Sequence, residues 1–153
     1  MKFSIYQSSR QGGRKYNQDR VAYSYSKESL LMVVAAGMGG HFHGEIAAQI
    51  TVQLVAEMFQ KQAHPTLRDP LFFLDQAIHA VHEAISDYSA ENELLESPRT
   101  TCVAVVIQRD MAYWAHVGDS RLYFFRQGRL VSRTQDHSRV QQMYEQGLIN
   151  EAQ

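Results

Sequence analysis

The sequence predicts an α+β fold in which two helices pack against an antiparallel sheet. Three observations support this prediction. Short segments in both halves of the chain have the composition and length of strands, two long central segments repeat apolar residues every three or four positions, and strands do not alternate with helices as in a doubly wound nucleotide-binding fold. The 153 residues, 44% of them hydrophobic, suffice for one domain with a packed core, which we assign to residues 1–153.

The first strands are predicted from β-rich side chains. Residues 3–8 and 21–26 carry Phe, Ile, Tyr, Val and Ser in short alternation. Gly12 and Gly13 lie between them and predict a turn that separates two strands. Residues 30–36 are a continuous apolar run that ends at Gly37, so we expect a buried strand that leads into a loop.

Two helices are predicted from apolar periodicity. In residues 44–63 the expected buried face consists of Ile46, Ala47, Ile50, Leu54, Val55 and Met58. In residues 70–90 it consists of Leu74, Ile78 or Ala77, Val81, Ile85 and Tyr88. Pro70 suits the first turn of a helix, which needs no N–H donor at that position. We expect the helices to lie side by side and antiparallel on the sheet.

The last third of the chain is predicted to contain short strands and then a helix. Strand composition occurs in residues 100–108, 112–117, 122–126 and 130–133. The dipeptides Arg109-Asp110 and Gln127-Gly128 are candidates for tight turns, so we expect an antiparallel meander. Residues 138–146 are predicted to be helical, with Gly147 as the signal for the helix end.

Charge and composition exclude several classes of function. Fifteen Lys and Arg against sixteen Asp and Glu give a net charge of −1, so the chain lacks the positive field that drives nucleic-acid binding. No segment approaches the roughly 18 apolar residues of a membrane span, and the N-terminus has no apolar signal segment. The single cysteine, Cys102, excludes an internal disulfide. We therefore expect a cytoplasmic protein that binds neither nucleic acid nor membrane.

Three clusters of polar residues and glycines lie at the ends of predicted strands, in residues 14–20, 37–45 and 118–121. An aspartate beside a glycine on such a loop suits a hard divalent cation, which prefers carboxylate and carbonyl oxygens. Taken one at a time, Asp19 and Asp119 are better explained as carboxylates that stabilise a turn. The clusters therefore indicate a site only when they are taken together.

Five elements stand in order along the chain: Asn17-Gln18-Asp19; Ala35-Ala36-Gly37-Met38-Gly39-Gly40-His41 followed by Gly44-Glu45; Val117-Gly118-Asp119-Ser120-Arg121; Asp136-His137-Ser138; and Glu145-Gln146-Gly147-Leu148-Ile149. Together they resemble the metal-dependent serine/threonine protein phosphatases of the PP2C (PPM) family, in their bacterial form. The resemblance covers essentially the whole chain.

This resemblance implies a two-sheet antiparallel β-sandwich flanked by the helix pair, with two Mn²⁺ or Mg²⁺ ions in a cleft at one end of the sheets. The ions would activate a water that attacks phosphoserine or phosphothreonine directly. Arg14 would bind the phosphate, Gly37 would give a backbone carbonyl to a metal, Asp19 would orient a metal-bound water, and Asp119 would serve an additional, weaker metal site. The partners would be phosphorylated proteins, the substrates of a bacterial serine/threonine kinase.

The sequence departs from the family pattern at two places. Ala36 stands where the family has the aspartate that bridges both metals, and without that carboxylate the mutual repulsion of two dications is not offset. The chain also stops at Gln153, before the part in which the family has two further metal-ligand aspartates and its last strands. We expect a C-terminally incomplete, inactive phosphatase domain that binds metal weakly and can self-associate through its open sheet. The alternative is a non-catalytic pseudophosphatase that binds phosphoproteins or regulatory partners.

Histidines take no part in metal binding in this interpretation. His41 and His137 are expected to shape loops. Met38 stands where eukaryotic members of the family have a histidine proposed to protonate the leaving alcohol, so that role would fall to water.

Overall fold

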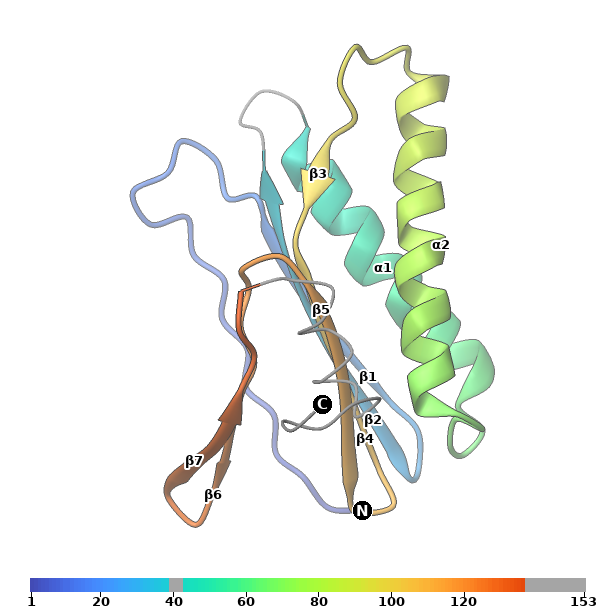
Figure 1. Cartoon of the computed structure of the whole chain (residues 1–153), viewed down its shortest axis with the longest axis vertical. Helices are drawn as coiled ribbons and strands as arrows, with labels where there is room; N and C mark the ends of the chain where they lie inside the picture. The colour runs from blue at the N-terminus through green and yellow to red at the C-terminus, as the bar shows by residue number, and fades with distance from the viewer. Residues whose placement is uncertain (39–42, 137–153) are drawn as a thin grey trace.

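The computed structural model describes residues 1–38 and 43–136. Its elements are, in order, β1 (Asp19–Tyr25), β2 (Ser29–Met38), α1 (Gly44–Gln62), α2 (Pro70–Glu91), β3 (Arg99–Thr100), β4 (Cys102–Gln108), β5 (Met111–Val117), β6 (Tyr123–Arg126) and β7 (Arg129–Arg133). The main sheet is antiparallel with the strand order β1-β2-β4-β5, and β3 pairs with the end of β2. β6 and β7 form a separate two-stranded sheet on the side of the main sheet away from the helices (Figure 1).

Both helices cover one face of the main sheet and run in opposite directions, which confirms the predicted antiparallel pair (Figure 1). Asp69 caps α2, because its carboxylate accepts a hydrogen bond from the Phe72 N–H at 3.1 Å, and Pro70 follows in the first turn. The rings of Phe59 and Phe73 meet edge to face across the helix pair, with centroids 6.2 Å apart. No helix in the described ranges has an apolar stretch long enough to cross a membrane.

The main core lies between the helix pair and the sheet. On α2 the buried face includes the predicted Leu74, Ala77, Val81 and Ile85, whereas the predicted Tyr88 is only half-buried. On α1 the most deeply buried residues are Ala47, Ala48, Thr51, Val52, Val55 and Phe59, whereas the expected Ile46, Ile50, Leu54 and Met58 are only half-buried. The small side chains at the centre of the buried face let α1 approach the sheet closely, so the larger ones lie at its margin.

Both predicted tight turns are confirmed. Arg109 and Asp110 connect β4 to β5 with φ angles of 52° and 60°. Gln127 and Gly128 connect β6 to β7 with φ angles of 52° and 76°. Positive φ at both central residues is typical of type I′ turns, whose twist matches that of two antiparallel strands.

Two strand predictions are wrong. Residues 3–8 form no strand, because an extended segment needs a partner for its backbone groups and no described segment pairs with it. The Phe3 ring instead packs edge to face on Tyr25, with centroids 5.5 Å apart. The meander also ends early: β5 does not pair with β6, since the chain leaves the main sheet at Gly118, where φ is 96°. The predicted helix 138–146 lies outside the described residues.

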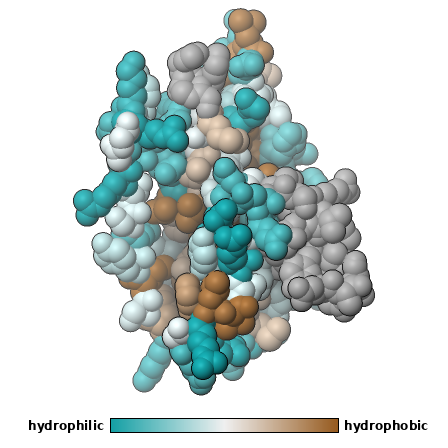
Figure 2. Space-filling model, turned by 60° about the vertical axis from the view of Figure 1, so that its left-hand side comes forward, coloured by the Kyte–Doolittle hydropathy of each residue, from teal (hydrophilic) through white to brown (hydrophobic). Residues whose placement is uncertain are grey.

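The sheet face turned away from the helices is apolar and partly open. It carries Val21, Tyr23, Met32 and Val34 from β1 and β2, which alternate with the core-facing residues. Tyr23 and Val34 are each 41% exposed. Figure 2 brings this side of the molecule forward, and apolar patches appear there between hydrophilic surfaces.

The connection between the helices is tied to the sheet by Gln108, which is buried at the end of β4. Its amide nitrogen donates to the Leu67 carbonyl at 2.9 Å, and its amide oxygen accepts from the Leu67 N–H at 2.9 Å and from the Ser29 hydroxyl at 3.0 Å. Every polar atom of this side chain therefore has a partner. These hydrogen bonds of Gln108 with Leu67 and Ser29, which we call the Gln108 joint, lie at the end of β4 opposite to Thr101.

Candidate active site

The antiparallel strand order brings the predicted site residues to one end of the main sheet. β1 begins at Asp19, β2 ends just after Gly37, and β5 ends two residues before Asp119. In antiparallel neighbours the start of one strand lies beside the end of the next. Thr101, which directly precedes β4, lies at the same end.

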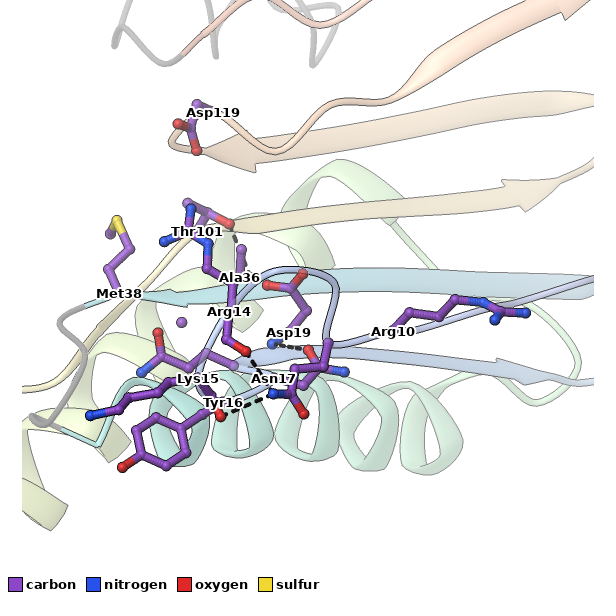
Figure 3. Close-up of a pocket in the computed structure, with 13 residues that line it drawn as sticks. Arg10, Arg14, Lys15, Tyr16, Asn17, Asp19, Ala36, Met38, Thr101 and Asp119 are labelled. Atoms are coloured by element: carbon purple, nitrogen blue, oxygen red, sulfur yellow. Dashed lines mark hydrogen bonds between the residues drawn. The ribbon is translucent and has the colours of Figure 1, made fainter.

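These residues line one cavity of about 610 Å³ (Figure 3). The structure brings together all four predicted site residues, Arg14, Asp19, Gly37 and Asp119, and it places Ala36 among them. The other lining residues are Arg10, Gln11, Lys15, Tyr16, Asn17, Gln18, Met38 and Thr101. The individual roles of the four residues remain predictions.

Ala36 lies directly opposite Asp19 in the register of β1 and β2. Residues paired in this way project from the same face of the sheet with their Cβ atoms about 5 Å apart. The pairing continues by one step, since the Gly37 N–H donates to the Gln18 carbonyl at 2.9 Å. The Ala36 methyl group therefore lies where a carboxylate could share a cation with Asp19.

Thr101 forms hydrogen bonds that link the start of β4 to the end of β2 at Ala36. Its N–H donates to the Ala36 carbonyl at 2.9 Å, and its hydroxyl oxygen accepts from the Ala36 N–H at 3.1 Å. The same hydroxyl is hydrogen-bonded to that of Ser120, the residue after Asp119. β3 and β4 pair with β2 in the same register, so the ladder of hydrogen bonds along β2 is continuous. Within this ladder the Thr101 hydroxyl oxygen takes the place of a backbone carbonyl as acceptor. Thr101 thereby connects the loop that carries Asp119 to the end of β2.

Gly37 occupies a position where no side chain fits. A Cβ atom there would lie 2.1 Å from the carbonyl oxygen of Gly44 and 2.9 Å from that of Gln18. A Cβ atom on Gly44, the first residue of α1, would lie 2.7 Å from the backbone nitrogen of Met38. The backbones of β2 and α1 are in direct contact, which explains why both positions are glycine.

Asn17 shapes the approach of the chain to β1. Its side-chain oxygen accepts from the Asp19 N–H at 3.1 Å, and its side-chain nitrogen donates to the Ser9 hydroxyl at 2.9 Å. The Arg20 guanidinium donates to the backbone carbonyls of Asn17 and Asp19, both at 2.8 Å. These contacts orient the backbone at Asp19 and leave its carboxylate exposed.

The segment before β1 supplies the basic side of the cavity. Arg10, Arg14 and Lys15 line it together with the carboxylates of Asp19 and Asp119. The Arg14 side chain points toward the centre of the site, whereas Arg10 points away from it (Figure 3).

The Arg14 backbone is held while its side chain stays available. The Gln11 side chain donates to the Arg14 carbonyl at 2.6 Å, and the Arg14 N–H donates to the Gln11 carbonyl at 3.3 Å. Within the described ranges the Arg14 guanidinium has no hydrogen bond and no ion pair. Its planar set of N–H donors can therefore bind an anion.

The described residues form no metal cluster. Across residues 1–38 and 43–136, no three His, Cys, Asp or Glu side chains come together in a group that could hold an ion. The carboxylates among the described lining residues are those of Asp19 and Asp119, and the backbone of Gly37 adds a carbonyl oxygen. A Mg²⁺ or Mn²⁺ ion can complete its coordination with water, but two adjacent ions repel each other unless a carboxylate lies between them. Position 36, opposite Asp19, carries a methyl group, so this set does not fit a centre of two ions.

Arg121 connects two of the five sequence elements. Its Nε donates to Asp136 Oδ1 at 3.2 Å, and its Nη1 donates to the Tyr123 hydroxyl at 3.4 Å. The hydrogen bond from Arg121 lowers the pKa of the Tyr123 hydroxyl. The Arg121–Asp136 pair is exposed, so it contributes little to stability and acts by joining two loops.

Sequence reasoning missed Thr101 and Arg10, and it included Lys15 in the cluster of residues 14–20 without a role. Thr101 belongs to a run with strand composition, and nothing in that run distinguishes its hydroxyl from that of an ordinary strand residue. Arg10 and Lys15 gave no signal beyond their charge. His41 and His137 lie outside the described residues, so the prediction that they shape loops stays a prediction.

Comparison with known proteins identifies the family. Residues 7–145 match the family described as protein phosphatase 2C. The serine/threonine phosphatase stp of Listeria monocytogenes serotype 4b is 31% identical over 139 residues, which cover 90% of this chain and 55% of the relative. The chain thus spans about half the length of this curated relative.

Solved structures agree with this match. The crystal structure of the Mycobacterium tuberculosis serine/threonine phosphatase PstP/Ppp has a TM-score of 0.68 at 31% identity, with coverage of 91% of this chain and 56% of that one. The PstP catalytic domain in complex with two manganese ions has a TM-score of 0.66 at 30% identity, with coverage of 91% and 57%. The family match covers residues 7–145 and the fold agrees with these solved structures, so the chain belongs to the protein phosphatase 2C family.

Proposed function

We propose that the function of this domain is the hydrolysis of phosphoserine and phosphothreonine in proteins, and that this chain, with Ala36, binds these groups without hydrolysing them. The observation that carries the proposal is the single cavity that contains Arg14, Asp19, Gly37 and Asp119 around Ala36. The names of the bacterial relatives support the substrate class. The substrates would be proteins phosphorylated by a bacterial serine/threonine kinase.

Phosphate binding is assigned to Arg14. Its guanidinium is unpaired within the described ranges and points into the cavity, and a guanidinium fork matches two oxygens of a phosphoryl group. Lys15 adds a second positive charge to the lining.

Mn²⁺ or Mg²⁺ is the cofactor that we propose for the family reaction, and the manganese complex of PstP supports it. The described residues of this chain do not fit two such ions, because the position opposite Asp19 carries a methyl group. We expect at most weak, partial binding that uses the oxygens of Asp19, Asp119 and Gly37. No hydrolytic step is assigned to these residues alone.

Peptide binding tests the phosphate site. A fluorescent phosphothreonine peptide should bind more tightly than its unphosphorylated form. The substitution Arg14→Ala should weaken binding of the phosphopeptide about tenfold, which corresponds to the loss of one charge-assisted hydrogen bond. Arg10→Ala is the matched control and should have a small effect, because that side chain points away. Equal binding of both peptides would refute the proposal.

Hydrolysis is tested separately. With Mn²⁺ and p-nitrophenyl phosphate, the chain should give no turnover, with or without EDTA, because its donors do not hold two cations in fixed geometry. EDTA-sensitive turnover by the unmodified chain would refute this assignment.

A second candidate function is favoured by Ala36 itself. A domain that keeps the phosphate site and lacks the bridging carboxylate could act as a pseudophosphatase that binds phosphoproteins or regulatory partners. The two candidates differ in their response to Ala36→Asp. Stronger Mn²⁺ binding by this variant favours the phosphatase, and unchanged Mn²⁺ binding favours the pseudophosphatase.

We also propose that the chain self-associates through its open apolar face. Tyr23 and Val34 are exposed on that face, and residues 3–8 have strand composition but pair with no strand in residues 1–38 and 43–136. Light scattering after gel filtration should give a mass that rises with concentration. A monodisperse species of 17.5 kDa would refute this proposal.

A further inference from the structure

A second cavity, of about 380 Å³, lies between α2 and the segment that enters β4. Its lining is mainly apolar and consists of Met38, Ile78, Val81, His82, Ile85, Ser86, Ser97, Pro98, Arg99, Thr100, Cys102 and Val117. The apolar wall of the cavity is well packed, since the side chains of Val81, Ile85 and Cys102 are less than a tenth exposed. Its volume lies within the usual range for ligand pockets, and an apolar lining with a few polar groups at the rim is their usual chemistry.

This second cavity adjoins the phosphate cavity. Met38 at the end of β2 lines both cavities and is 42% exposed. It pairs with Arg99 of β3, which belongs to the second cavity alone. A peptide held in the phosphate cavity can therefore pass over Met38 and reach the second cavity. An unbranched, flexible methionine side chain adapts to different neighbours at such a position.

The rim of the second cavity is positively charged. Arg99 is exposed and has neither a hydrogen bond nor an ion pair within the described part of the chain. His82 stands at the same rim, and none of the described residues that line the cavity is a carboxylate. The exposed hydroxyls of Ser86 and Ser97 add polar groups. The complementary occupant is an apolar side chain with a carboxylate beside it.

We propose that this cavity is a specificity site that binds an apolar side chain of the substrate protein, with an acidic residue next to it, close in sequence to the phosphorylated residue. The inference rests on the proposed function, because the phosphoryl group must be held in the neighbouring cavity. The apolar side chain is buried against α2, and the acidic residue pairs with Arg99. This arrangement makes the domain select among phosphoproteins by the sequence around the phosphate.

A scan of fluorescent peptides tests the proposal. Each peptide carries a central phosphothreonine in an alanine background, with one Leu-Glu pair moved along the positions before and after it. Binding to the unmodified chain is measured by fluorescence anisotropy. Peptides with the Leu-Glu pair at one or two of these positions should bind about tenfold more tightly than the all-alanine phosphopeptide. A tenfold gain corresponds to the lower end of the free energy that burial of a leucine side chain contributes.

Three variants separate the two cavities. Ser86→Trp fills the rim and should abolish the gain from the Leu-Glu pair while leaving the all-alanine phosphopeptide unaffected. Glu83→Trp is the matched control, since Glu83 is an exposed residue on the same helix that does not line the cavity, and it should keep the gain. Arg99→Ala should remove the part of the gain that comes from the glutamate, so that Leu-Glu and Leu-Gln peptides bind alike.

Two outcomes would overturn the proposal. Equal affinity for every placement of the Leu-Glu pair, with phosphorylation still required, would leave the phosphate site standing and refute the specificity site. A gain from Leu-Glu that does not need phosphorylation would refute the proposed function and show that the cavity binds unphosphorylated peptides instead.

Discussion

The substitution Ala36→Asp should make the stability of this domain dependent on Mn²⁺. The new carboxylate would lie opposite Asp19, with the two Cβ atoms about 5 Å apart in register. Two like charges at about 5 Å repel by about 1 kcal/mol when water screens them fully and by about 3 kcal/mol at the effective dielectric constant of a protein surface. Without metal, the variant should therefore be about 1 to 3 kcal/mol less stable than the parent chain.

A divalent cation between the two carboxylates reverses the sign of this interaction. Chemical denaturation with and without Mn²⁺ should show a gain in stability for Ala36→Asp that the parent lacks, and calorimetric titration should give at least tenfold tighter Mn²⁺ binding. Ala36→Asn is the control, because it has nearly the same shape and no charge. Its stability should not respond to Mn²⁺.

Two results would contradict this reasoning. Equal stability of the Asp and Asn variants in EDTA would mean that position 36 is not electrostatically coupled to Asp19. Unchanged Mn²⁺ affinity in the Asp variant would mean that the cavity cannot gather oxygen donors around a cation. The variant should still not hydrolyse p-nitrophenyl phosphate, since one added carboxylate does not complete a two-ion centre from the described donors.

Three further predictions concern stability. Gly37→Ala should destabilise the domain by about 3 kcal/mol or more, because its Cβ would lie 2.1 Å from the Gly44 carbonyl oxygen, and denaturation should find a much smaller loss for Gly13→Ala, which meets no atoms. Gln108→Leu should cost about 2 to 4 kcal/mol in denaturation, since it leaves the Leu67 N–H and carbonyl buried without partners, whereas Gln108→Glu should restore only the acceptor contacts. Burial raises the pKa of the Cys102 thiol to about 12, so the unfolded chain loses this proton at lower pH than the folded chain, and stability falls by about 1.4 kcal/mol per pH unit from about pH 9 upward. The stability of Cys102→Ala should lack this part of the pH dependence, and identical slopes for the two proteins would contradict the prediction.

Local signals in the sequence were sufficient for the elements whose partners are close in sequence. Arg109-Asp110 and Gln127-Gly128 lie between short apolar strands, and a two-residue turn determines which residues pair on either side of it. Residues 3–8 show the limit of this reasoning. Their composition is that of a strand, but a strand exists only when another segment supplies hydrogen bonds, and composition does not say whether one is present.

The candidate site could be predicted in part for the same reason. Arg14, Asp19, Gly37 and Asp119 stand in recognisable sequence elements, which is why the sequence alone predicts that they share a site. That Ala36 faces Asp19 follows from the strand register, which depends on contacts across the whole sheet. The role of Thr101 depends on a single hydroxyl orientation beside Ala36, which no sequence pattern encodes.

The Gln108 joint has a consequence for the cooperativity of the fold. Leu67 lies in a connection between two helices, where backbone amides ordinarily exchange their hydrogens with water within short times. Its N–H is instead bonded to a side chain from the end of β4, and that side chain also accepts from Ser29 at the start of β2. Exchange at the Leu67 amide therefore requires release from Gln108 of the sheet, and we expect this to happen together with separation of the sheet and the helix pair. A loop residue should share the exchange rate of the central strands, so the helix pair and the sheet unfold as one unit rather than as two.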